Sequence, residues 1–236
     1  MKRYLELGCA YGGMVFAVLF GIGFVGLAHF VPPLDPNATA EQTAAVFRDN
    51  TNGIRTGLLL SYIGCVFYLA FGASINAETQ RIVSVPTVLL KLQSAAFSAS
   101  ILLIAGPIMV WLAAAFRPES NQSAELVQAL NDFGWISFLF GWVPFVTWYM
   151  ATGAAILCDT QGNDRVYPRW SGYLSLALGL GQTSASLLIY FKTGPFAWNG
   201  LFSWWLPATE FFLWFIVITV LTVKAINKRY RAAGSC

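Results

Sequence analysis

The sequence has few charged residues. Asp, Glu, Lys and Arg together make up 11% of its 236 residues, whereas a water-soluble domain carries about 25%. Hydrophobic residues make up 57% of the chain. So little polar surface cannot face water on all sides, which excludes an ordinary soluble domain. We therefore expect an integral membrane protein whose main contact is with membrane lipid.

Metal-binding side chains are also scarce. The chain has one histidine, His29, and four cysteines, none of which forms a CxxC pair. A bis-histidine haem and a Cys/His zinc site therefore both lack ligands. A carboxylate-only metal site would need several acids inside the membrane, and Glu210 alone is clearly placed there. We predict no metal and no cofactor.

Two further absences narrow the function. No GxSxG, HExxH or phosphate-binding GxxxxGK[ST] motif occurs, so no standard catalytic signature identifies an enzyme. No basic stripe runs along the chain, and its densest basic run, residues 224–231, follows an apolar segment. Such a run is typical of a cytoplasmic membrane anchor, so we predict no nucleic-acid partner.

What the chain does contain is apolar runs long enough to cross a bilayer. A helix needs about 20 residues to span the hydrocarbon core, and backbone groups in lipid must be satisfied within the helix. The sequence predicts an all-α, polytopic membrane protein, a six-transmembrane-helix bundle forming one transmembrane domain over residues 1–236. The predicted spans lie near 9–31, 54–76, 87–115, 133–158, 170–191 and 203–226.

Basic residues predict the orientation of these spans. Ten Lys and Arg residues lie at the termini and in the loops on their side, against four on the other side. The positive-inside rule then places both termini in the cytoplasm (N-in/C-in). The outer side should carry a short helix near 39–50, because Thr39 followed by Gln42 forms a capping-box pattern. Ser123 is a second predicted cap, for a helix that runs into the fourth span.

Small residues and prolines predict how the helices pack. Small side chains four residues apart let helix backbones approach closely in lipid. They recur in the fifth predicted span at Ser171, Ser175, Gly179 and Thr183. Pro107 and Pro144 are expected to interrupt helix interiors, whereas Pro207 can sit in a first turn.

The apolar run LPATEFFLWFIV holds one carboxylate, Glu210. A helix rises 1.5 Å per residue, so Glu210 should lie roughly 10 Å below the outer surface. Counting to the same depth in other spans suggests an outer-leaflet pocket with Glu210 on its wall. The candidate ligand-binding residues are Glu210, Tyr62, Trp111 and Gln182 in this layer, with His29, Arg55 and Lys192 above them.

Two interpretations of Glu210 remain open. An ionisable residue within a span is a functional candidate because its burial is costly. A neutral Glu210 can donate a proton or a hydrogen bond, so Glu210 and Asp132 are the catalytic candidates. A Glu210 that pairs with Arg55 or Lys192 would instead be a structural ion pair.

Aromatic residues extend the pocket hypothesis. Trp142 lies in mid-span and is a candidate wall for a flat apolar ligand. Anchoring at the membrane interface is the simpler interpretation for the remaining tryptophans near span ends, which are Trp135, Trp198, Trp204 and Trp205.

Two stretches of the chain resemble a known family. They are FVPPLDPNATAEQTAAVFRDNTNGIRTGLLL and, later, VYPRWSGYLSL together with FKTGPFAWNGLFSWWLP. They resemble a family of bacterial six-span integral membrane proteins of unknown function. The resemblance implies a bacterial inner (plasma) membrane and a multi-pass topology. It implies no activity and assigns no site residue.

Three functions are compatible with the sequence. We favour a non-enzymatic membrane protein that binds or conveys a lipophilic small molecule, as an accessory subunit with a membrane-protein partner. The second is an intramembrane enzyme in which Glu210 acts as general acid on an isoprenoid-like or sterol-like substrate. The third is a structural or assembly subunit.

Overall fold

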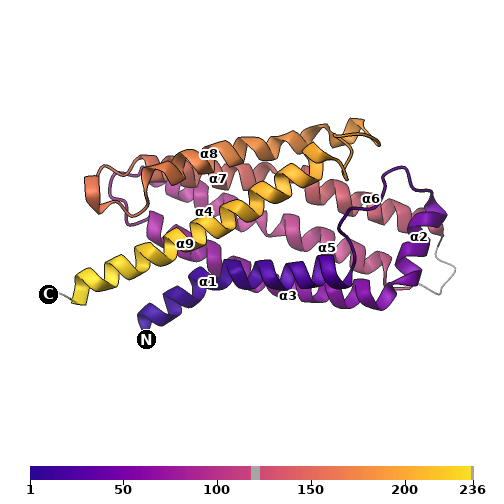
Figure 1. Cartoon of the computed structure of the whole chain (residues 1–236), viewed down its shortest axis with the longest axis horizontal. Coiled ribbons are helices and arrows are strands. Elements are labelled where there is room, and N and C mark those ends of the chain that lie inside the picture. Colours follow the sequence, from indigo (N-terminus) through magenta and orange to yellow (C-terminus); the bar gives the residue numbers. More distant parts are fainter. Residues whose placement is uncertain (118–122, 235–236) are drawn as a thin grey trace.

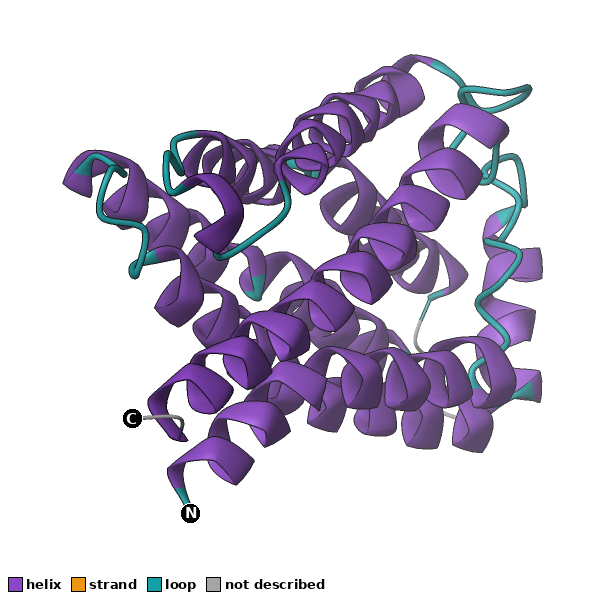
Figure 2. Cartoon of the chain, turned by 60° about the vertical axis from the view of Figure 1, so that its left-hand side comes forward, coloured by secondary structure: helices purple, strands orange, loops and turns teal. Residues whose placement is uncertain are grey.

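The fold is a bundle of helices running along one long axis (Figure 1). The computed structural model describes residues 1–117 and 123–234, and no strand occurs among them (Figure 2). The α-helices are α1 Lys2–Phe20, α2 Ala40–Asp49, α3 Thr51–Thr79, α4 Thr87–Ser100, α5 Leu102–Ala114, α6 Ala124–Phe140, α7 Val143–Leu157, α8 Arg169–Gln182 and α9 Leu206–Gly234.

Six of the helices described are long and apolar enough to cross a membrane. They are Lys2–Leu27, Thr51–Thr79, Thr87–Ala114, Ala124–Leu157, Arg169–Tyr190 and Leu201–Ala232. Both termini lie at one end of the bundle, and α2 lies at the other (Figure 1). We call these the terminal end and the α2 end. An even number of crossings requires that the two termini share a side.

The helix α2 confirms the capping-box prediction. Thr39 Oγ1 accepts from the backbone N–H of Gln42 at 3.2 Å, and Gln42 Oε1 accepts from the N–H of Thr39 at 2.8 Å. Ser123 likewise accepts from the N–H of Leu126 at 3.2 Å and caps α6. The loop of residues 28–39 is held in place at the α2 end by a hydrogen bond of 2.6 Å, which Trp198 Nε1 donates to the carbonyl of Leu34.

Five of the six described spans change their helical form along their length. The first ends in a π-helix, η1 Gly21–Leu27, and the sixth begins with another, η4 Leu201–Trp205. The fifth continues α8 as a 3₁₀-helix, η3 Thr183–Tyr190. The third and fourth spans are interrupted at single points, between α4 and α5 and between α6 and α7. Such local changes often mark functional positions in helices.

Glycines allow the closest helix contacts. A Cβ atom on Gly23 of η1 would collide with the carbonyl of Gly57 and with Ser61 on α3. Gly153 of α7 and Gly172 of α8 face each other in the same way, each against the other's carbonyl. Close packing through small residues therefore does join neighbouring spans, as the sequence pattern predicts.

The prolines occupy three different positions. Pro107 lies inside α5, as predicted. Pro144 interrupts the fourth span, as predicted: the helix breaks at Gly141 and Trp142, within the turn whose hydrogen bond a proline removes, and Pro144 falls in the first turn of α7. Pro207 is the second residue of α9. Proline is tolerated in a first turn since the amide it lacks has no partner there.

The core consists largely of aromatic rings. Toward the α2 end, Phe24, Phe30, Trp111 and Trp135 make mutual ring contacts at centroid distances of 4.9–6.0 Å. Trp135 is fully buried there. Trp198 and Trp204 are also buried, so the anchoring interpretation was wrong for these three residues. Trp205 is exposed, as an interfacial anchor would be.

Candidate binding cavity

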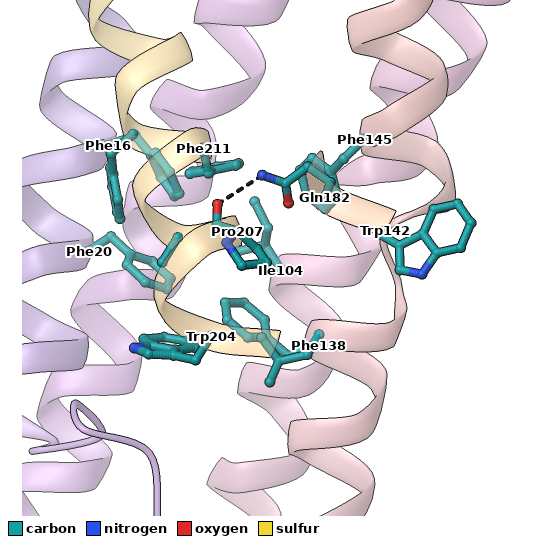
Figure 3. A pocket seen from close by; sticks show the side chains of 13 residues that line it. Phe16, Phe20, Ile104, Phe138, Trp142, Phe145, Gln182, Trp204, Pro207 and Phe211 are labelled. Carbon is teal, nitrogen blue, oxygen red and sulfur yellow. Dashed lines mark hydrogen bonds between the residues drawn. The ribbon is translucent and has the colours of Figure 1, made fainter. Parts of the chain in front are cut away.

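An apolar cavity of about 90 Å³ lies inside the bundle. Figure 3 shows it between Phe16 and Phe20 of α1, Phe138 of α6 and Pro207 and Phe211 of α9. Its lining residues are Phe16, Phe20, Ile104, Phe138, Leu139, Trp142, Phe145, Gln182, Trp204, Pro207, Ala208, Phe211 and Phe212.

The cavity is located where the spans change form. Phe20 is the last residue of α1, and Gln182 is the last residue of α8. Trp142 lies at the break between α6 and α7, and Trp204 and Pro207 flank the junction of η4 with α9. Backbone irregularity within a membrane is tolerated where it is buried in protein or lines a cavity. The departures from regular helix therefore converge on one place.

Few polar groups face this cavity. Gln182 Nε2 donates to the carbonyl of Pro207 at 2.8 Å (Figure 3), and Gln182 Oε1 makes no hydrogen bond within the described part of the chain. The indole N–H groups of Trp142 and Trp204 also have no partner there. A mostly apolar wall with a few free polar groups is typical of a site for a small lipophilic ligand.

Two residues of the predicted pocket, Trp142 and Gln182, line the cavity. Trp111 is fully buried but belongs to the ring cluster toward the α2 end. Tyr62 is 40% exposed on the outside of α3, because its position on that helix faces away from the bundle. His29 is exposed in the loop after η1, with a φ of 57°. The structure does not bring Tyr62 or His29 to the cavity.

The predicted cations have other partners. Arg55 Nε donates to the carbonyl of Ala115 at 3.0 Å, and its NH2 group donates to the carbonyl of Phe116 at 2.7 Å. Arg55 thus satisfies carbonyls at the end of α5 and does not reach Glu210. Lys192 is exposed and interacts electrostatically with Asp132 at the α2 end. Neither Asp132 nor Lys192 lines the cavity.

Glu210 lies beside the cavity and not in its wall. Its carboxyl group packs against Gly181 of α8, so closely that a Cβ atom there would collide with Oε1. The side chain has 9% of its surface exposed, and Oε2 has no hydrogen-bond partner among the described residues. Glu210 forms no ion pair within the same residues. The predicted pairing with Arg55 or Lys192 is therefore absent from the described chain.

A second buried acid, Glu78, escaped the sequence analysis. It is 2% exposed near the end of α3 and pairs with Arg81, which lies in the turn just after that helix. Arg229 of α9 pairs with Glu78 at 3.0 Å and also with Glu6 of α1. Glu78 lies beyond the predicted second span near 54–76, because α3 continues past the apolar run to Thr79. In the sequence, Glu78 is an isolated acid three residues before Arg81, and this spacing could have indicated an ion pair.

Uncharged polar residues lie near Glu78 at the terminal end. Thr79 donates to Gln93 of α4 at 2.8 Å, and Gln93 Nε2 donates to Thr152 of α7 at 2.9 Å. Tyr167, in the loop before α8, shares a hydrogen bond of 3.0 Å with Thr222 of α9. Burial raises the pKa of the Tyr167 hydroxyl, so that group stays protonated. These bonds join α3, α4 and α7 to one another and connect the loop before α8 to α9.

Comparison with known proteins yields no match to a family model, to a curated protein or to a solved structure. The resemblance to a family of bacterial six-span membrane proteins therefore stays a prediction.

Proposed function

We propose that this protein is an integral membrane protein that binds or conveys a lipophilic small molecule in the aromatic cavity. The observation that carries the proposal is that residues from several helix irregularities line that cavity: Phe20 just before η1, Trp142 at the α6–α7 break, Gln182 just before η3 and Trp204 in η4. Each irregularity costs regular helix hydrogen bonds, and a ligand site is a common reason to retain such features.

The size of the cavity defines how a ligand would sit. An engineered cavity of about 150 Å³ holds a benzene molecule, so a cavity of 90 Å³ accommodates only a short chain segment of a ligand. The remainder of the molecule would extend toward lipid past Phe138, Trp142 and Phe212, which are half-buried. Gln182 Oε1 offers an acceptor for a ligand hydroxyl group.

The enzymatic alternative has less support. Its proposed acid, Glu210, does not line the cavity, and neither does Asp132.

We further propose that the protein lies in the bacterial inner membrane with both termini in the cytoplasm. There it would act as an accessory subunit of a membrane complex. The excess of basic residues at the terminal end supports this orientation.

Mass spectrometry of molecules that copurify from native membranes tests the proposal. Ala208 lines the cavity, and its neighbour Thr209 is exposed on the same helix. Ala208→Leu should fill the space and reduce the copurified lipophilic molecule about tenfold, which corresponds to about 1.4 kcal/mol. Thr209→Leu is the matched control and should leave the amount unchanged. Equal recovery from all three proteins, or no enriched molecule in any, contradicts the proposal.

A further inference from the structure

Glu210 lies in the seam between α7, α8 and α9. Gly181 covers one side of its carboxyl group, and more than nine-tenths of the side chain is buried. Oε2 makes no hydrogen bond within the described chain. The hydroxyl of Tyr149, on α7, is fully buried and equally without a partner there. Tyr149 stacks on Trp214, one turn further along α9 from Glu210, at 4.1 Å, and it interacts electrostatically with Glu210.

The groups facing Glu210 supply no positive charge. From α7 the titratable group is Tyr149, which also interacts with Tyr68 of α3. The adjacent residues of α8 are Gly181 and Gln182, and the Gln182 amide is already bound to Pro207. Among the residues described, no cation pairs with Glu210: Arg55 donates to carbonyls, and Arg48 pairs with Glu41.

An ionised carboxylate in this setting would be costly. The penalty for burying an unpaired ion amounts to several kcal/mol after relaxation, and binding a counter-charge removes it. A metal ion would need more ligands, and no group of three metal-binding side chains occurs within the described chain. The cavity is not lined by Glu210, so a larger organic cation in it would not reach the carboxyl group. A proton is the cation that needs no additional space.

We propose that Glu210, with Tyr149 beside it, is a proton-binding site within the membrane. Glu210 holds a proton at neutral pH and exchanges it with the α2 side of the membrane. Such a group reacts with a hydrophobic carbodiimide. The acid proton passes to a carbodiimide nitrogen, the carboxylate oxygen bonds to the central carbon, and the adduct rearranges to a stable N-acylurea without loss of any atom. This site does not depend on an occupant of the cavity.

Carbodiimide labelling tests the site. The full-length protein, reconstituted in phosphatidylcholine vesicles at neutral pH, is treated with dicyclohexylcarbodiimide and its peptides are analysed by mass spectrometry. We expect an adduct on the peptide that contains Glu210, loss of that adduct in Glu210→Gln, and full labelling in Asp132→Asn. Glu78 is the internal control, because its carboxyl group is paired with Arg81 and Arg229 and should not react. Absence of the Glu210 adduct, or equal labelling of Glu78, overturns the proposal.

Infrared spectroscopy provides a second test that does not depend on access of the reagent. The wild-type spectrum at neutral pH should contain the carbonyl stretch of a protonated carboxylic acid, and Glu210→Gln should lack it. Because an amide closely replaces a neutral acid, Glu210→Gln should melt at the wild-type temperature. A wild-type spectrum without that band, combined with a less stable variant, would mean that Glu210 is charged and paired, and the proposal fails.

Discussion

Two buried acids in this protein are stabilised in different ways. Glu78 is surrounded by Arg81 and Arg229, so its burial is compatible with a charge. Glu210 has apolar residues on both sides in the sequence and Gly181 across the seam, without a cation among the described residues. A glutamate therefore forms structural ion pairs at the terminal end, and in our proposal another glutamate binds a proton toward the α2 end.

Neutralising Glu78 should destabilise the bundle. Glu78→Gln removes the buried carboxylate that Arg81 and Arg229 share, and breaking a buried pair costs about 3–5 kcal/mol. Unfolding in mixed micelles, followed by circular dichroism, measures the loss. Glu6→Gln is the control, because Glu6 also pairs with Arg229 but is 37% exposed at its side chain. It should cost at most about 1 kcal/mol. Equal losses of unfolding free energy in the two variants would show that the buried Glu78 stabilises the bundle no more than the exposed Glu6 does.

At the scale of the element, the spans combine regular α-helix with π and 3₁₀ segments. Pro144 shows how much of this the sequence reveals. A proline inside a long apolar run predicts a break in the preceding turn, and the span does break there, at Gly141 and Trp142. No such signal predicts the π and 3₁₀ segments. Gly23 lies in the π segment and lets η1 approach α3. Local propensity allows each arrangement, and packing against a neighbour selects one.

Gly23→Ala should separate η1 from α3. A new Cβ atom would overlap the backbone of α3, and overpacking of this kind costs about 1–3 kcal/mol. The loss is measurable as a lower melting temperature in detergent. Gly26→Ala in the same π-helix is the matched control, since nothing lies within 4 Å of its added Cβ atom. Alanine favours helix over glycine, so the control should match or slightly exceed the wild type. A tolerated Gly23→Ala would argue against tight contact here.

At the scale of the whole molecule, α2 and the termini lie at opposite ends (Figure 1). In our proposal the α2 end faces outward. Single cysteines at Asn37 and Asp164, both exposed, report on the two ends after the native cysteines are replaced. An impermeant maleimide should label Asn37→Cys in right-side-out vesicles, and Asp164→Cys only after permeabilisation. The reverse pattern would mean that the orientation is inverted.

Parts of the candidate site were predictable and parts were not. Depth counting along ideal helices pointed to Gln182, and the mid-span aromatic position pointed to Trp142; both residues line the cavity. It failed for Tyr62, because equal depth says nothing about which face of α3 a residue occupies. It also failed for Arg55, which satisfies the last carbonyls of α5, a partner that no sequence pattern identifies.

Composition and hydropathy by themselves determine that the chain is helical with six membrane-length spans, because lipid accepts only apolar helices whose backbone groups are satisfied internally. The caps of α2 and α6 were also readable, since capping depends on residues three positions apart. Tertiary structure alone decided that the helix irregularities meet at one cavity, that Glu78 is paired and that Glu210 is not. Those outcomes depend on which faces of distant segments come together. Each apolar helix can rotate about its own axis and still expose apolar residues to lipid, so hydropathy does not select these faces.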